Sequence, residues 1–346
     1  MRSTLSATLS ATLSATALSA ALLSPAAHAA GPDPRAMFQP IKAPAAPKGV
    51  EEAKVLLGQQ LFHEARLSKN HDISCNSCHT LTKHGVDGEP TSLGHKGQRG
   101  GRNSPTVLNA SGHLAQFWDG RAADVEAQAK GPVLNPVEMA MPSAEAAVAV
   151  LSSMPEYVEA FKRAFPDAAD PVTYDNFGAA VGAFERQLVT PSRFDKFLEG
   201  DNKALSAAER EGLDLFMSVG CTACHSGALL GGQMYQKVGL VKPWPNQADQ
   251  GRFDLTKQES DRMVFKVPSL RNIERTAPYF HDGQTKTLDE AVSMMAEHQL
   301  GRTLEPAQVK SIVTFLKTLT AAPAARWLKT PKLPKSSATT PKADPT

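Results

Sequence analysis

The chain has 346 residues, of which 41% are hydrophobic, 6% aromatic and 21% charged, a composition typical of a globular protein. The net charge of +2 excludes a strong electrostatic attraction to nucleic acid or anionic lipid, so no nucleic-acid partner is expected. Beyond residue 30 no apolar run approaches the roughly 18 residues that a membrane-spanning helix needs, so a soluble protein is expected. The length suits two domains of ordinary size.

Residues 1–30 have the features of a secretory signal peptide. Arg2 is their only charge, and it precedes a run rich in Ala, Leu, Ser and Thr. Small residues then provide a cleavage site near Ala29 or Ala30. Ser and Thr are unusually frequent for an apolar region, so a low-complexity leader without a targeting role is the alternative. Residues 31–49, rich in Pro and Ala, are interpreted as a linker.

A first domain is expected over residues 50–198. A helical pattern begins near Val50 and leads to the sequence Cys75-Asn76-Ser77-Cys78-His79. Residues 85–120 are rich in Gly, Asn, Ser and Pro, and a loop of this length in a compact protein is usually functional. Two further helices are expected, over residues 144–165 and 174–188.

A second domain is expected over residues 199–321, after a boundary near residues 195–202. Ser206 and Glu209 form a capping box, and the helix that it opens leads to Cys221-Thr222-Ala223-Cys224-His225. An irregular segment, 231–262, and a last helix, 306–319, follow. Residues 322–346 contain much Pro, Lys and Thr and are expected to be disordered. Both halves thus have the same plan, and because alternating strand patterns are weak the fold class is predicted as mainly α.

All four cysteines fall in two copies of Cys-x-x-Cys-His, which leaves none for a disulfide or a separate zinc site. This spacing lets two thiols add to the vinyl groups of one haem, and the adjacent histidine supplies an axial ligand to its iron. The sequence therefore predicts two haem c groups. One is attached through Cys75 and Cys78 with His79 on its iron, the other through Cys221 and Cys224 with His225. Bacteria attach such haem outside the cytoplasm, which supports export to the periplasm.

The sixth ligand of each iron decides what a haem does, and the residues alone leave it open. The candidates for the first haem are His84, His95 and His113, and those for the second are Met294, Met295 and His298. His95 stands among glycines, so the segment that carries it is expected to be mobile, and a ligand there could leave the iron. A solvated loop side chain is the alternative interpretation of His95.

Residues 57–319 resemble the bacterial di-haem cytochrome c peroxidase family. The similarity extends well beyond the two haem motifs, to the stretches 61–68, 102–106, 117–122, 131–139, 184–186, 265–272 and 276–283. The resemblance implies two cytochrome c-like domains with long irregular loops. It also implies a periplasmic homodimer that reduces hydrogen peroxide with electrons from a small redox protein, such as a monohaem cytochrome c or a blue copper protein.

The resemblance implies different roles for the two haems. The first is expected to be the peroxidatic haem, with His79 as its proximal ligand and His95 as a detachable distal ligand. The second is expected to transfer electrons, with His225 and Met295 as ligands. Met295 is preferred because the family's ligand stands four residues before the glutamine that corresponds to Gln299.

Other site residues also follow from the resemblance. Trp118 corresponds to a tryptophan between the haems, Glu138 to the carboxylate that moves protons at peroxide, and Gln128 to a neighbouring pocket residue. A calcium ion is expected on Asn103 and on the backbone carbonyls of Thr276 and Pro278, since oxygen donors suit this hard cation.

Two other classes of function are weighed. The first is an electron carrier without peroxide chemistry, in which both irons keep six ligands and Glu138 has no role. The second is a protein-modifying di-haem enzyme like the one that matures methylamine dehydrogenase. Those enzymes have Tyr where this chain has Met295, which argues against that function.

Overall fold

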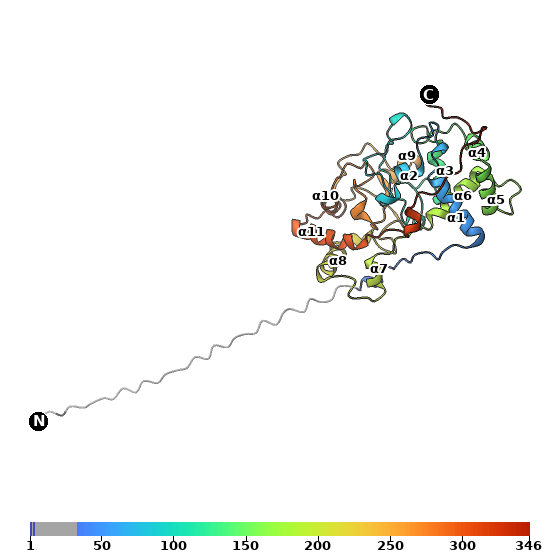
Figure 1. The fold of residues 1–346 in the computed structure, drawn as a ribbon. Helices are drawn as coiled ribbons and strands as arrows, with labels where there is room; N and C mark the ends of the chain where they lie inside the picture. Colours follow the sequence, from blue (N-terminus) through green and yellow to red (C-terminus); the bar gives the residue numbers. More distant parts are fainter. Residues whose placement is uncertain (2, 4–32) are drawn as a thin grey trace. The chain divides into compact units, whose positions relative to one another are not determined.

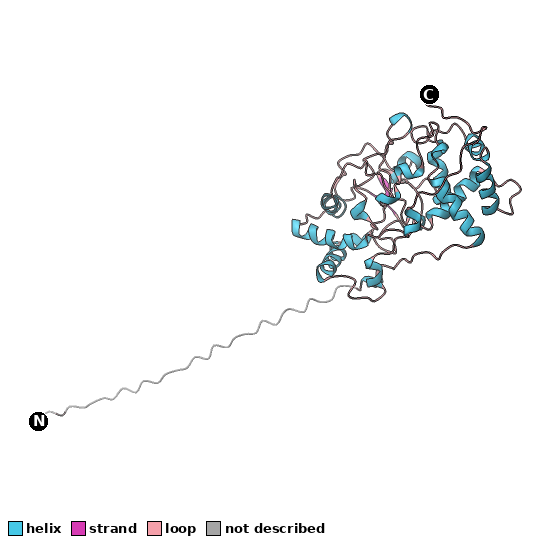
Figure 2. Cartoon of the chain, in the orientation of Figure 1, coloured by secondary structure: helices cyan, strands magenta, loops and turns pink. Residues whose placement is uncertain are grey.

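The computed structural model describes residues 33–346 together with Met1 and Ser3, so the expected signal peptide and its cleavage site lie outside the described residues. Helices joined by long irregular segments make up residues 33–346 (Figures 1 and 2). The prediction of a mainly α fold is confirmed. No helix in this described part combines the length and apolar character needed to cross a membrane.

The helices are α1 (Gly49–Phe62), α2 (Cys75–Cys78), α3 (Val125–Leu134), α4 (Ala144–Ser152), α5 (Pro155–Ala164), α6 (Tyr174–Glu185), α7 (Arg193–Leu198), α8 (Ala207–Val219), α9 (Phe253–Thr256), α10 (Leu288–Met294) and α11 (Pro306–Leu316). Two short strands, β1 (Tyr235–Lys237) and β2 (Val264–Lys266), pair antiparallel with Tyr235 opposite Lys266. A π-helical turn, Met295–Gln299, continues α10.

The first hydrophobic cluster is built around the crossing of α1 and α6. Gly58 makes the crossing close, because a Cβ atom at this position would lie 1.9 Å from the carbonyl oxygen of Ala180. Phe62 and Phe184 pack edge to face beside it, with ring centroids 5.5 Å apart. The apolar stripe of each helix is thus buried by the other.

The second hydrophobic cluster is likewise built around a helix crossing, that of α8 and α11. A Cβ atom at Gly212 would lie 2.1 Å from the carbonyl oxygen of Ser311, so the two helices also cross at a glycine. Phe315 contacts both Phe194 and Phe216, with ring centroids 5.3 Å apart in each pair. The expected capping box is confirmed, since the Ser206 amide donates to Glu209 Oε2 at 2.8 Å and the Glu209 amide to Ser206 Oγ at 3.3 Å.

Helix α7, which lies before the expected boundary at residues 198/199, packs in the second cluster. The first cluster ends at Leu188 in this region, and Phe194 packs in the second. The expected linker also joins the second cluster, where Phe38 packs against Phe194 with ring centroids 5.4 Å apart. The Ile41 amide donates to Asp195 Oδ1 at 2.8 Å. Residues 33–49 therefore bind along the second half instead of merely connecting two elements.

The helix expected over residues 144–165 is divided in two. Helix α4 ends at Ser152 and α5 begins at Pro155. Proline has no amide hydrogen and clashes with the preceding turn, so it is tolerated only in the first turn of a helix. Helix α6 ends at Glu185, before the expected Leu188. The segment 85–120 is irregular as expected, with 3-10 turns as its only helices.

The C-terminal residues 322–346, expected to be disordered, instead pack along the first half. Trp327 is buried in the first cluster, 5.9 Å from the Phe184 ring. Backbone carbonyls hold the rest, because Gln59 Nε2 donates to Lys329 O at 3.0 Å and Arg66 donates to Pro334 O at 2.8 Å. The composition of residues 322–346 does not predict this packing, because backbone groups of the segment make most of its hydrogen bonds to the first half.

The two halves contain corresponding turns. Asn109 and Asn272 both adopt left-handed backbone angles, with φ of 61° and 63°, and each precedes a 3-10 turn. Phe117 and Phe280, at the same spacing from them, have φ of 65° and 68°. Each Phe begins a Phe-x-Asp-Gly sequence. The residues in the variable position of these sequences, Trp118 and His281, are therefore structural counterparts.

Replacing Trp327 with Ala should lower the free energy of unfolding by about 3–5 kcal/mol, because it removes a buried aromatic side chain and leaves a cavity. Urea denaturation followed by far-UV circular dichroism measures the change. Lys329→Ala, an exposed neighbour, is the control and should have little effect. Equal stability of both variants would contradict the packing of this segment.

Candidate functional site

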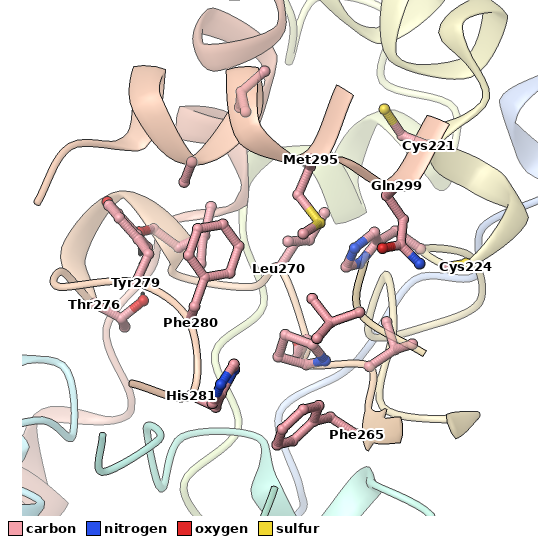
Figure 3. Close-up of a pocket in the computed structure, with 18 of the residues that line it drawn as sticks. Cys221, Cys224, Phe265, Leu270, Thr276, Tyr279, Phe280, His281, Met295 and Gln299 are labelled. Atoms are coloured by element: carbon pink, nitrogen blue, oxygen red, sulfur yellow. Dashed lines mark hydrogen bonds between the residues drawn. The ribbon is translucent and has the colours of Figure 1, made fainter. Parts of the chain in front are cut away.

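Each Cys-x-x-Cys-His motif lies at the wall of a large cavity. The first cavity, lined by Cys75, Cys78 and His79, has an empty volume of about 1780 Å³, its open mouth included. The second, which Figure 3 shows, is lined by the Cys221–His225 motif and has about 1710 Å³. Each motif therefore opens on a space in which a covalently attached group would lie.

The ring of His225 is prepared to bind a metal through one nitrogen. Helix α8 ends at Val219, and its C-cap residue Gly220 leads into a 3-10 turn over Cys221–Ala223. Nδ1 of His225 lies 3.0 Å from the carbonyl oxygen of Leu230, so this nitrogen carries the hydrogen and Nε2 keeps its lone pair. Burial lowers the pKa of His225, which favours the neutral ring that an iron ligand requires.

His79 is also buried, but its ring is less well hydrogen-bonded than the ring of His225. It ends the single helical turn α2, which Ser74 and Ser77 cap. Burial lowers its pKa, while the backbone near Gly85 and Pro105 acts to raise it. Its Nδ1 makes no hydrogen bond of good geometry to any residue that the structure describes. The two proximal histidines therefore differ in the support of their rings.

The cysteines are suited to thioether formation rather than to a thiolate metal site. Each of the four is free of a disulfide. Burial raises the pKa of Cys75 and Cys221 to about 12, so these thiols stay protonated. Over residues 33–346 no group of three or more His, Cys, Asp or Glu side chains is arranged to hold a metal ion. The donor set fits covalent haem at both motifs.

Glu138 lies at the wall of the first cavity, beyond the end of α3. Its Oε1 accepts a hydrogen bond of 2.7 Å from Asn135 Nδ2. Burial raises the pKa of Glu138, and the positive charge of Arg121 opposes this increase. Gln128, on α3, lines the same cavity. The expected carboxyl and its expected neighbour are thus brought together at one cavity.

His95 is brought close to Glu138 by its backbone. The His95 amide donates to the carbonyl oxygen of Glu138 at 2.8 Å. Gly94 makes this approach possible, since a Cβ atom there would lie 1.9 Å from the carbonyl oxygen of Val137. The His95 side chain is only 6% exposed but does not line the cavity, whereas Leu93 and Gly94 do. The backbone of this segment is therefore fixed against the residue that carries the carboxyl.

Met295 lies at the wall of the second cavity, and Figure 3 shows its sulfur directed into the site. The sulfur of Met294 instead accepts a hydrogen bond of 3.3 Å from Thr285 Oγ1. His298 Nδ1 faces the carbonyl oxygen of Pro243 at 2.9 Å, and this residue does not line the cavity. This arrangement favours Met295, the first residue of the π-helical turn, and such turns are frequent at functional sites.

The other histidine candidates for the first iron lie elsewhere. His113 lines the second cavity. His84 adopts a left-handed conformation after the 3-10 turn Leu81–Lys83 and lines neither cavity.

The two cavities share a wall made by residues 103–106 and 117–118. Trp118 Nε1 donates to the carbonyl oxygen of Asn103 at 2.9 Å, and the Trp118 carbonyl accepts from the Lys266 amide at 2.8 Å. The Asn103 amide donates to the carbonyl oxygen of His281 at 2.8 Å. Trp118 thus lies between the cavities, fixed to both halves of the chain.

A chain of ion pairs supports this wall. Arg102 donates to Asp249 at 2.8 Å and to Asp119 at 2.7 Å. Arg121 also donates to Asp119, at 3.0 Å, and its guanidinium lies 3.5 Å from the centre of the Phe117 ring. The charge that acts on Glu138 is therefore held in place by the residues of the shared wall.

The three expected calcium ligands meet at the second cavity. Asn103, Thr276 and Pro278 all line it. The Asn103 amide nitrogen donates to the carbonyl oxygens of Glu89 and Pro90, at 3.0 and 3.3 Å, which leaves its side-chain oxygen available as an acceptor.

Three residues of the cavities received no role from the sequence. Arg121 and Glu185 line the first cavity, and Lys266 lines the second. Burial and the nearby Glu126 raise the pKa of Glu185 to about 8. Each of the three belongs to a stretch that resembles the family. For Glu185 the sequence also offered a second indication of a role, since it is a charged residue inside the apolar face of α6.

Comparisons with known proteins agree with this geometry. A family model described as di-haem cytochrome c peroxidase matches residues 52–203. A protein of Nitrosomonas europaea named cytochrome c551 peroxidase is 51% identical over 310 residues, which covers 89% of this chain and 90% of that protein. A protein of the same name from Pseudomonas aeruginosa is 48% identical over 299 residues, covering 85% of each.

A solved structure of a MauG-like protein associated with microbial copper homeostasis is similar to this chain, with a TM-score of 0.70 and 28% sequence identity. The match covers 85% of this chain and 96% of that one.

Replacing Met295 with Leu should remove the methionine–iron charge-transfer absorption of the second haem and lower its midpoint potential, because a thioether ligand raises the potential. Met294→Leu is the matched control and should keep both properties, although it loses the contact with Thr285. Absorbance spectroscopy and a potentiometric titration measure the outcome. Loss of the band in the Met294 variant alone would reverse the assignment.

Proposed function

The chain belongs to the di-haem cytochrome c peroxidase family, and from that premise we propose that it reduces hydrogen peroxide to water with electrons from a small redox protein. The observation that carries the proposal is Glu138, a carboxyl of raised pKa at the wall of one cavity, which Trp118 separates from a second cavity. A monohaem cytochrome c or a blue copper protein would serve as the electron donor.

Residues of both motifs would hold the cofactors. Cys75 and Cys78 attach the first haem, with His79 on its iron, and the Cys221–His225 motif attaches the second. When bound, the first haem supplies an iron that binds peroxide and delivers electrons to it, and the second supplies electrons from the donor.

Glu138 moves the proton at the reaction site. It would accept a proton from one oxygen of hydrogen peroxide and return it to the other, which leaves as water when the oxygen–oxygen bond breaks. The overall reaction consumes one hydrogen peroxide, two electrons and two protons and yields two waters. Asn135 orients the carboxyl, and the partial burial that raises its pKa suits a group that must both accept and donate. Gln128 is proposed to contact the bound peroxide from α3.

His225 and Met295 are proposed as the ligands of the electron-transfer haem. The position of Trp118 in the wall of both cavities supports its role on the electron path between them.

His95 is proposed as the distal ligand of the first iron in the fully oxidised enzyme, and reduction of the second haem would release it. The neighbouring residues Leu93 and Gly94 line the first cavity, which supports a role of this segment at the first iron. Calcium on Asn103, Thr276 and Pro278 would stabilise the arrangement of the two halves in which release occurs. These ligands all belong to the wall of the second cavity, which supports a link between the two sites.

We also propose that residues 1–30 export the chain to the periplasm, with cleavage near Ala29 or Ala30, and that the mature enzyme is a homodimer. Both proposals rest on the family and on the sequence of the N-terminus. Cell fractionation and light scattering of the purified protein test them.

Replacing Glu138 with Gln should reduce peroxide turnover by about 10²–10⁴-fold, the usual contribution of a general acid–base group, and leave both haem spectra intact. The assay follows oxidation of a reduced small cytochrome c by hydrogen peroxide. Glu156→Gln, an exposed carboxylate on α5, is the control and should keep full turnover. Full turnover in the Glu138 variant would contradict the role of this carboxyl in proton transfer, and no turnover in the wild type would leave only an electron carrier.

The same assay gives a pH dependence. Burial raises the pKa of Glu138, so its proton-accepting form is lost at higher pH than in an exposed glutamate. When the pH is lowered, kcat/KM should therefore begin to decline at a pH higher than about 4.3, the ordinary pKa of glutamate.

Electron paramagnetic resonance tests the release of His95. The oxidised protein should show two low-spin haems, and the half-reduced protein with calcium should show a high-spin first haem. Removing calcium with a chelator should return this haem to low spin. His95→Gly is the control and should be high-spin throughout. A low-spin first haem in the half-reduced protein with calcium contradicts release, and a high-spin one in the oxidised wild type shows that the site is permanently open.

A further inference from the structure

A lysine and a histidine form an unusual pair in the wall of the second cavity. Lys266, the last residue of β2, donates from Nζ to Nδ1 of His113 at 2.7 Å. Both residues line the cavity, and Lys266 is only 5% exposed. Accepting this bond keeps Nδ1 of His113 unprotonated and places the ring hydrogen on Nε2, which is buried and has no hydrogen-bond partner in the described part of the chain.

The ammonium group of Lys266 has no counter-ion among the residues that the structure describes. Among the ion pairs of residues 33–346 none includes Lys266. Desolvation alone lowers its pKa to about 8, with no contribution from a neighbouring charge, so the group is still largely protonated at neutral pH. Burial of an unpaired charge is strongly unfavourable. His113 cannot balance this charge, because its own pKa is pulled well below the usual value by burial and by Lys266.

The position of the pair in the cavity indicates which anion belongs there. Figure 3 shows Cys221 and Cys224 on one side of the site and Phe265, the residue before Lys266, on another. A haem carries its vinyl groups and its two propionate carboxylates on opposite edges. Since the cysteines hold the vinyl edge, the carboxylate edge is directed away from them. Lys266 is bonded through its amide to Trp118 in the wall shared by the two cavities, and neither cysteine belongs to that wall.

We propose that Lys266, oriented by His113, is the counter-ion of a propionate carboxylate of the haem attached at Cys221 and Cys224. Two of the three ammonium hydrogens remain for the carboxylate after the bond to His113. The Lys266 amide is bonded to the Trp118 carbonyl at 2.8 Å, so the same strand residue fixes the carboxylate and the wall between the cavities.

The pairing has a consequence for the potential of this haem. Loss of Lys266 would leave a negative charge unbalanced in a desolvated site, which favours the oxidised, more positive iron. The lysine therefore raises the midpoint potential and helps the second haem to accept electrons. The proposal rests on attachment of the second haem, and it does not depend on peroxide turnover.

Lys237 provides a matched control, because it also lines this cavity but is exposed. Its charge is screened by solvent, so it should contribute little. Lys266→Met and Lys237→Met remove the same charge from the same cavity, and Lys266→Arg keeps the charge while changing its geometry.

The experiment uses the full protein with both haems attached. In Lys266→Met the ratio of reduced to oxidised second haem at a fixed potential should fall about tenfold, a midpoint shift of about 59 mV for a one-electron couple. The propionate bending mode in resonance Raman spectra should shift as well. Lys237→Met should change neither quantity, and Lys266→Arg should shift the Raman mode while retaining the midpoint.

An unchanged midpoint and Raman mode in Lys266→Met would overturn the proposal, as would a shift confined to Lys237→Met. If Lys266→Met does not acquire its haems, the test uses the propionate Raman mode of Lys266→Arg alone. An unchanged mode in this variant would overturn the pairing. Peroxide turnover by the wild type is measured separately, so a failure of the proposed activity leaves this result standing.

Discussion

The hydrogen bond from Trp118 Nε1 to the carbonyl oxygen of Asn103 fixes the wall on which both cavities depend. Two backbone bonds complete it, from Asn103 to His281 and from Lys266 to Trp118, and each joins one half of the chain to the other. The separation of the haems, the position of the expected calcium ligand and the direction of Lys266 all follow from these three bonds. Two of them join main-chain groups only, so the wall tolerates a change of side chain better than a shift of backbone.

The two cavities derive from one repeated plan but differ in charge. Trp118 and His281 occupy corresponding positions after Phe117 and Phe280, and the two rings meet at 6.3 Å. The first cavity has a carboxyl of raised pKa, Glu138, which suits proton transfer. The second contains a buried ammonium in place of such a group, which favours a reduced iron. A few residues in the cavity walls thus give the two haems different chemistry. The crossing helices of the two halves remain similar.

Local patterns in the sequence were sufficient for the features that depend on neighbouring residues. The haem motifs, α1 and the capped start of α8 are of this kind, since spacing and capping act within a few positions. Local patterns did not indicate that α7 packs in the second cluster or that Trp327 packs in the first, because distant partners hold both. The roles of Lys266 and His113 could not be found either, because their pairing joins residues far apart in the chain.

The position of His95 links ligand exchange to acid–base chemistry. Its amide is bonded to the carbonyl oxygen of Glu138, and Gly94 contacts the carbonyl of Val137 with no room for a side chain. If the proposed binding of His95 to the iron moves its backbone, it must break this bond or shift the backbone of Glu138. Such a shift would also displace the Glu138 carboxyl, which accepts a hydrogen bond from Asn135. The proposed ligand exchange and the position of the proton-transferring group would then be coupled through a single backbone hydrogen bond.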